Sequence, residues 1–261
     1  MCGLAGILTD RLPPAGVIGR MCDSLQHRGP DDGRTWTDED AGVAIGFRRL
    51  AILDLSDAGC QPMHSPCGRY VLVFNGEIYN HLELRSTLAR QGKHTAAADC
   101  TAWRGHSDTE TLLACVNAWG VEAALERLVG MFAFGLWDRR DRRLWLARDR
   151  FGEKPLYYGW VGGAFVFASE LVAFRQYPEF ANPIDRDVLA LYTRHSCVPA
   201  PYSIYRHIYK LEPGCVMRVS GEAAAHPPAG ALHAPARARG ISTERYWSFL
   251  DVVRQDRKSV V

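Results

Sequence analysis

The chain opens with Met1-Cys2-Gly3-Leu4-Ala5-Gly6-Ile7-Leu8. Removal of the initiator methionine, which a small second residue permits, would make Cys2 the amino terminus, with a thiol and a free α-amine on one residue. The amine titrates at about 8 and the thiol at about 8.5 in unperturbed peptides, so the amine can act as a general base for the thiol. Taken alone, Cys2 is more simply interpreted as a small buried residue. The N-terminal nucleophile therefore needs an oxyanion hole and an amino-acid pocket elsewhere in the chain.

Outward from this stretch, residues 3–8 alternate as in a half-buried strand, and residues 15–26 have the spacing of an amphipathic helix. Residues 27–33 are rich in turn formers. Further strands are predicted at 42–47, 70–74, 131–138, 144–148, 155–160 and 164–168. Helices are predicted at 81–91, after 107 and at 185–193, and the two earlier ones begin with the capping-box pairs Asn80/Glu83 and Ser107/Glu110. Without a regular βαβ rhythm, this order predicts an α+β protein built in layers.

The bulk composition narrows the class of protein. Of 261 residues, 47% are hydrophobic and 23% charged, and the formal net charge is +2, so electrostatics give no case for nucleic acid or an anionic membrane as partner. No apolar run approaches the roughly 20 residues of a membrane span, and no secretory signal is evident. The eight cysteines form no C-x-x-C pair and no zinc spacing. We therefore expect no metal site, and reduced thiols in a cytoplasmic protein.

Three groups of polar residues could supply the chemistry of acyl transfer. Asn75 and the backbone of Gly76 could donate to an oxyanion, although Asn-Gly is also a common tight turn. The guanidinium of Arg49 could bind a carboxylate through two parallel hydrogen bonds. The alternative is that Arg49 is a solvated surface arginine. Glu77 and Asp108 could hold a substrate ammonium, although acidic residues favour helix N-termini for electrostatic reasons alone.

Seven motifs in order carry a family resemblance. They are Met1-Cys2-Gly3, His27-Arg28-Gly29-Pro30-Asp31-Asp32, Arg49-Leu50-Ala51-Ile52-Leu53, Asn75-Gly76-Glu77-Ile78-Tyr79-Asn80, His106-Ser107-Asp108-Thr109-Glu110, Gly130-Met131-Phe132-Ala133-Phe134 and Arg148-Asp149-Arg150-Phe151-Gly152-Glu153-Lys154-Pro155-Leu156-Tyr157-Tyr158. With them, the chain resembles the glutaminase domain of class II glutamine amidotransferases, of the glutamine-hydrolysing asparagine synthetase type. The resemblance covers residues 1 to about 220 and resumes at Tyr246-Trp247.

The resemblance implies a fold and a site. The fold would be an N-terminal-nucleophile hydrolase sandwich of four layers, αββα. Cys2 would be the nucleophile, Asn75 and Gly76 the oxyanion hole, and L-glutamine the substrate. Arg49 would bind its α-carboxylate, and Glu77 and Asp108 its α-amine. The pocket would be lined by the backbone of Leu50, Ala51, Ile52 and Leu53. No cofactor is expected in this chain, and ammonia would pass to a synthetase domain that activates aspartate with Mg-ATP.

The resemblance also divides the chain. Residues 2–219 would be the amidotransferase domain, and 220–261 a linker and the start of the synthetase domain. Residues 221–240 are predicted to be flexible, and 91–104 a surface loop. The pyrophosphate loop Ser-Gly-Gly-Leu-Asp-Ser is absent, and the last six residues do not fit the family pattern. An artefactual end to a longer reading frame and a natural stand-alone glutaminase both remain open. So do a homodimer, another ammonia acceptor, and a non-catalytic module that keeps the fold only for interaction.

Overall fold

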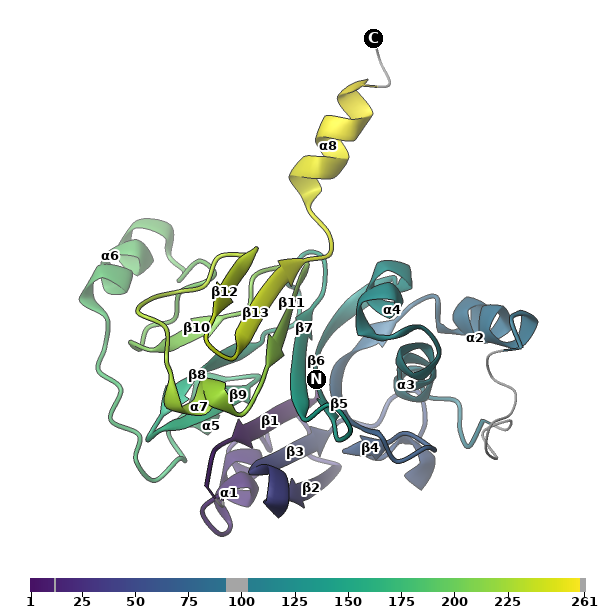
Figure 1. The fold of residues 1–261 in the computed structure, drawn as a ribbon, viewed down its shortest axis with the longest axis horizontal. Coiled ribbons are helices and arrows are strands. Elements are labelled where there is room, and N and C mark those ends of the chain that lie inside the picture. Colours follow the sequence, from purple (N-terminus) through teal and green to yellow (C-terminus); the bar gives the residue numbers. More distant parts are fainter. Residues whose placement is uncertain (12, 93–102, 259–261) are drawn as a thin grey trace.

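A computed structural model describes residues 1–11, 13–92 and 103–258. In it, two antiparallel sheets lie face to face (Figure 1). The first sheet has the order β10 (Ile208–Lys210), β8 (Tyr157–Val161), β9 (Ala164–Ala168), β1 (Gly3–Leu8), β3 (Val43–Arg49), β2 (Asp32–Asp38). The second has the order β12 (Ala236–Ala238), β13 (Ile241–Arg245), β11 (Cys215–Val219), β7 (Arg143–Arg148), β6 (Gly130–Asp138), β5 (Tyr70–Ile78), β4 (Met63–His64).

Helices cover the outer face of each sheet. On the first sheet, α1 (Val17–Asp23) and α5 (Leu171–Phe174) pack against β1, β3 and β9. The second sheet is covered by α2 (His81–Arg90), α3 (Asp108–Trp119) and α4 (Val121–Arg127). The predicted four-layer αββα sandwich is therefore confirmed. The remaining helices are α6 (Arg186–His195), α7 (Glu222–Ala225) and α8 (Phe249–Lys258), with single 3-10 turns at Glu39–Ala41 and Asp57–Gly59.

The alternation of side chains along the strands decides what enters the space between the sheets. In β1, Leu4 and Leu8 face the second sheet, while Ala5 and Ile7 face the helices outside. Successive side chains of a strand point to opposite faces, so Cys2, just before β1, continues the inward row of Leu4. The same rule extends the inward rows of β3 and β5 to polar residues at their ends. The sandwich core thus gives way to a polar site at one end.

Two strands near the cavity, β2 and β5, differ from what the sequence predicted. Residues 27–33 were expected to form a turn, but β2 begins at Asp32, where it pairs with Arg49 of β3. The strand expected at 70–74 continues to Ile78, so Asn75 and Gly76 lie within β5 rather than in a loop. Gly76 has a packing role there, because a Cβ would lie 2.3 Å from the carbonyl oxygen of Met131 on β6. The close approach that needs this glycine is therefore to a neighbouring strand.

The predicted flexible linker at 221–240 is wrong. Ala223 and Ala224 of α7 are buried in the core between the sheets, and the Ala223 carbonyl accepts a hydrogen bond of 2.7 Å from the Trp160 indole. After the linker segment, β13 pairs with β11 along its whole length. The second sheet thus continues past residue 219. The alanine side chains of α7 are small enough to pack against β9 and fill the core between the sheets.

The tail after this sheet packs against neighbouring segments where it begins. The Tyr246 hydroxyl donates to the Arg148 carbonyl at 2.8 Å, and the Trp247 ring meets Phe151 edge to face. Tyr246 and Trp247 therefore pack against the end of β7 and the loop that follows it. Beyond them, α8 projects away from the body of the molecule (Figure 1). No helix in the three described ranges is both long and apolar enough to cross a membrane.

The two capping pairs behave differently. Ser107 caps α3 as predicted, accepting from the Glu110 amide at 3.2 Å. Asn80 makes no cap bond to α2; it accepts from the Val129 amide and donates to the Arg127 carbonyl, both at 3.0 Å. The predicted loop at 91–104 lies mostly outside the described residues.

Candidate functional site

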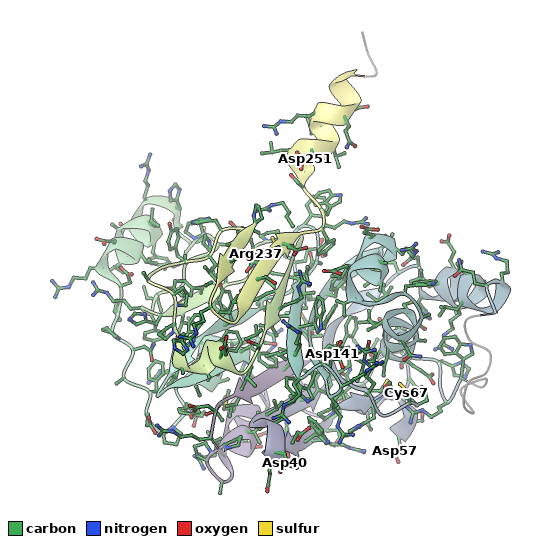
Figure 2. All side chains as sticks on the ribbon, in the orientation of Figure 1. Asp40, Asp57, Cys67, Asp141, Arg237 and Asp251 are labelled. Carbon is green, nitrogen blue, oxygen red and sulfur yellow. The ribbon has the colours of Figure 1, made fainter. Side chains whose placement is uncertain are left out.

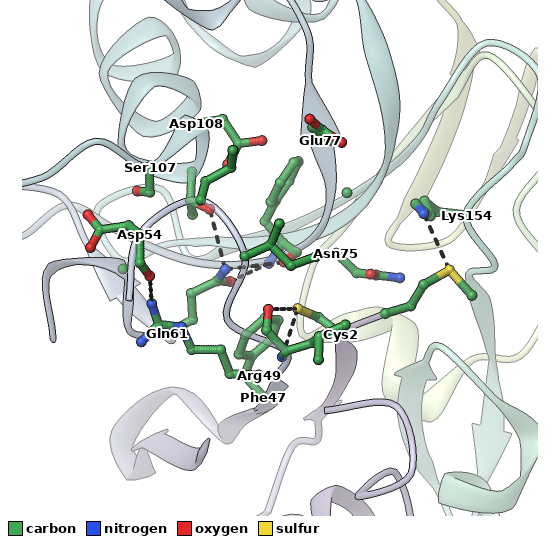
Figure 3. Close-up of a pocket in the computed structure, with 18 of the residues that line it drawn as sticks. Cys2, Phe47, Arg49, Asp54, Gln61, Asn75, Glu77, Ser107, Asp108 and Lys154 are labelled. Atoms are coloured by element: carbon green, nitrogen blue, oxygen red, sulfur yellow. Dashed lines mark hydrogen bonds between the residues drawn. The ribbon is translucent and has the colours of Figure 1, made fainter. Parts of the chain in front are cut away.

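A cavity of about 200 Å³ opens where the inward rows of β1, β3 and β5 end (Figure 3). Nine of the ten predicted site residues line it: Cys2, Arg49, Leu50, Ile52, Leu53, Asn75, Gly76, Glu77 and Asp108. Ala51 does not line it, and its amide donates instead to the Asp31 carboxylate at 2.8 Å. Within the described residues, no three metal-binding side chains gather as a metal site would need.

Strand register places Cys2 beside the Arg49 segment. Gly3 pairs with Arg48 across β1 and β3, so Cys2 lies opposite Arg49, the last residue of β3. The Leu50 amide donates to Cys2 Sγ at 3.3 Å, and the thiol lies 3.6 Å from the Leu50 carbonyl oxygen. Burial raises the pKa of the Cys2 thiol, against the hydrogen bond from Leu50 and the positive charges of the N-terminus, Arg49 and Arg28.

Asn75 presents an unused donor in this cavity. Its side chain is 2% exposed, and its amide nitrogen Nδ2 is buried without a hydrogen-bond partner in the described part of the chain. A buried polar group without a partner costs roughly 1–3 kcal/mol, so native proteins seldom keep one without a use. The tight-turn alternative for Asn75-Gly76 is wrong, because both residues are strand residues paired with β6.

Arg49 is a buried residue, 9% exposed, at the end of β3. Its guanidinium donates to the Asp54 carbonyl, to the Ser56 carbonyl at 3.1 Å and to the Cys60 sulfur at 3.3 Å. The alternative of a solvated surface arginine is therefore wrong. These contacts fix the plane of the fork at the cavity wall.

Asp108 is the first residue of α3, as predicted, but it is not an exposed helix-end charge. It is 5% exposed, and its Oδ2 accepts from the Ile78 amide at 2.8 Å. Burial raises its pKa, against that hydrogen bond. Glu77, on the inward row of β5, lines the same cavity (Figure 3). The two carboxylates therefore approach the cavity from a strand and from a helix N-terminus.

Arg28 contacts two segments that are distant from it in the sequence. Its Nε donates to the Cys2 carbonyl at 2.9 Å, and its Nη1 pairs with Glu170 at 2.6 Å. The Asp31 carboxylate likewise accepts a hydrogen bond from a distant segment, at the Ala51 amide. The sequence could not reveal these contacts, because the partners lie 20 to 142 residues away.

The loop after β7 places a lysine at the cavity. Arg148 donates to the carbonyls of Gly152, Lys154 and Leu211, and Asp149 accepts from the Lys154 amide. Arg148 and Asp149 thus hold this loop through side-chain hydrogen bonds to its backbone. The loop directs Lys154, 7% exposed, so that its Nζ lies 3.3 Å from Met1 Sδ.

Gln61 and Asp54 also line the cavity, and no motif in the sequence indicates a role for either. The Gln61 amide bonds both the amide (2.6 Å) and the carbonyl (3.2 Å) of Phe74, the residue before Asn75. The Asp54 carboxylate accepts from Ser56 and from the His106 amide, and these bonds lower its pKa to about 2. No local pattern marks such residues, since their partners come from other segments.

The chain is similar in sequence to known proteins. The model of the glutamine amidotransferase domain family matches residues 1–228. A putative glutamine-hydrolysing asparagine synthetase of Mycobacterium tuberculosis is 39% identical over 240 residues, 85% of this chain and 35% of that protein. Asparagine synthetase 1 of Bacillus subtilis is 39% identical over 219 residues, 82% of this chain and 33% of that protein. The chain thus spans about a third of these relatives.

The fold has solved counterparts as well. The glutamine phosphoribosylpyrophosphate amidotransferase of B. subtilis superposes with a TM-score of 0.61 at 22% identity, covering 94% of this chain and 49% of that one. This likeness concerns the sandwich alone, and the family match covers the segments that build the cavity. The chain belongs to the family of glutamine amidotransferase domains.

Proposed function

We propose that this chain hydrolyses L-glutamine to glutamate and ammonia, with Cys2 as the nucleophile. The observation that carries the proposal is the buried, unpartnered Asn75 amide, which shares a cavity with the Cys2 thiol. A preorganised donor in a closed site is worth most to a charge that develops only during reaction. Loss of Cys2 or Asn75 would have favoured a non-catalytic module, and both are present.

The reaction follows from these groups. The Cys2 sulfur attacks the γ-carboxamide carbon, and the thiol proton passes to the α-amine that loss of Met1 exposes. The oxyanion accepts from Asn75 Nδ2 and the Gly76 amide. Ammonia leaves with that proton, and water hydrolyses the thioester. Arg49 holds the substrate carboxylate, while Glu77 and Asp108 hold its ammonium.

We further propose that the ammonia serves an asparagine synthetase that uses aspartate and Mg-ATP. The names of the relatives, of which the chain spans about a third, support this acceptor. The acceptor site would lie outside these 261 residues, so another acid or a sugar remains the rival. The seven free cysteines among the described residues agree with a reducing, cytoplasmic setting.

The test is an assay of the purified chain with glutamine, aspartate and Mg-ATP, following glutamate, asparagine and pyrophosphate separately. We expect glutamate alone. Intact mass should show loss of Met1, and 6-diazo-5-oxo-L-norleucine, a glutamine analogue with an electrophilic diazoketone, should label Cys2. Labelling of another cysteine, or no glutamate release by a chain that has lost Met1, would contradict the proposal.

A further inference from the structure

We propose that Asp54 is a positioning residue that sets the spacing between the two ends of the glutamine site. Its backbone carbonyl holds Arg49, which would bind the α-carboxylate. Its side-chain carboxylate holds the segment just before Asp108, which would bind the α-ammonium. The inference rests on the proposed function and adds a residue to it.

The first contact is on the Arg49 side. Arg49 Nη2 donates to the Asp54 carbonyl, and Nη1 donates to the Ser56 carbonyl at 3.1 Å. The guanidinium therefore takes its orientation from the backbone of residues 54–56. Gly59 closes the other side, because a Cβ there would lie 2.5 Å from Arg49 Nη2.

The second contact uses both oxygens of the Asp54 carboxylate. Oδ1 accepts from the Ser56 amide at 2.9 Å and from its hydroxyl at 2.6 Å. Oδ2 accepts from the His106 amide at 2.9 Å. His106 stands two residues before Asp108. One side chain thus ties the Arg49 loop to the segment just before α3. Figure 3 shows the other Asp54 contact, from its carbonyl to Arg49.

The segment that Asp54 holds has little freedom of its own. Arg85 of α2 donates to the carbonyls of Gly105 (3.1 Å) and Ser107 (2.9 Å), and Glu110 accepts from the Gly105 amide at 3.1 Å. A Cβ on Gly105 would lie 2.2 Å from Asp54 Oδ2. A displacement of Asp54 therefore carries over to the relative position of Arg49 and Asp108.

This arrangement requires a carboxylate. In Asp54→Asn one oxygen becomes an NH2 group, which must face either the His106 amide or the Ser56 amide, donor against donor. A misplacement of about 1 Å can cost on the order of a hundredfold. We expect the KM for glutamine to rise roughly tenfold to a hundredfold, with kcat within a few-fold. Because the pKa of Asp54 is lowered to about 2, the loss in kcat/KM should be the same from pH 6 to pH 9.

The experiment compares Asp54→Asn with Asp57→Asn, a matched change in the same loop whose carboxylate is 92% exposed and lies at the surface (Figure 2). Three measurements are made on each variant: steady-state kinetics for kcat and KM, inactivation by 6-diazo-5-oxo-L-norleucine, and alkylation of Cys2 by iodoacetamide. Only the kinetics and the diazoketone inactivation depend on recognition of the amino-acid end. Asp54→Asn should raise KM and slow the diazoketone, leaving iodoacetamide alkylation unchanged, and Asp57→Asn should match the parent chain.

Gly105→Ala adds a Cβ that would press on the Asp54 carboxylate from the segment before α3. It should likewise raise KM and slow the diazoketone without changing iodoacetamide alkylation. This variant replaces Asp54→Asn in the test if Asp54→Asn does not fold. Unchanged KM in both variants, loss of kcat at constant KM, or equal loss of iodoacetamide reactivity would overturn the role of Asp54. Failure of the proposed function is distinguishable, because the parent chain itself would then neither release glutamate nor be labelled at Cys2.

Discussion

Asn75→Ala should lower kcat strongly while leaving the free energy of unfolding almost unchanged. If Asn75 Nδ2 donates to the oxyanion, its loss should lower kcat by roughly 10²–10³, or about 2.7–4 kcal/mol of transition-state stabilisation. KM should change little, because the ground-state carboxamide gains less from this donor than the oxyanion does.

The stability of the same variant should hardly move. Nδ2 is buried without a partner in the described chain, so its removal returns roughly 1–3 kcal/mol of desolvation. The cavity left by the amide costs a similar amount, and we expect the free energy of unfolding to change by only about 1 kcal/mol. Gln61→Ala is the contrast, because it leaves the buried Phe74 amide without a hydrogen-bond acceptor. It should lower the free energy of unfolding by about 1–3 kcal/mol.

The assay is glutamate release for kcat and KM, with calorimetric unfolding of each variant. A change confined to KM would move Asn75 from the oxyanion hole to substrate binding. Marked destabilisation of Asn75→Ala would show that its amide is not the unpaired group described above. Either result would refute the reasoning.

Three further predictions can be checked with the same protein. Cys2→Ala should abolish glutamate release, measured at high enzyme concentration, because no other group replaces the thiol nucleophile. Arg49→Lys should raise KM for glutamine with kcat little changed, because lysine keeps the charge but loses the planar fork that its buried partners fix; a fall in kcat alone would contradict this. In a chain that retains Met1, burial raises the pKa of the Cys2 thiol, so iodoacetamide alkylation should be slow at pH 7 and accelerate only above about 8.5, later than in the unfolded chain.

Much of the site could be predicted because short motifs and strand periodicity carry it. Cys2, Arg49 and Asn75 each continue an apolar row of period two, so the rows that build the core also point these side chains into one cavity. The strand limits around Asn75 were misjudged because Asn-Gly is a strong turn signal locally, whereas pairing with β6 decided the outcome.

What the sequence did not reveal depends on contacts between distant segments. Asp54 reaches His106 across 52 residues, and Arg28 reaches Glu170 across 142. Residues 221–240 were interpreted by composition as flexible, yet Ala223 and Ala224 are small enough to fill the core under β9. Composition describes the average behaviour of a segment, and tertiary packing overrode it here.

Strand β13 has a consequence for where this chain can be cut. It covers the whole edge of β11, pairing Cys215 through Val219, although it follows the segment that composition marks as a linker. A fragment ending near residue 220 would leave β11 with a row of unpaired backbone groups and exposed Val216 and Val219. Such bare edges invite pairing with other chains. A fragment that ends at Tyr246 keeps β13 paired with the edge of β11. It should stay monodisperse, whereas the shorter fragment should aggregate.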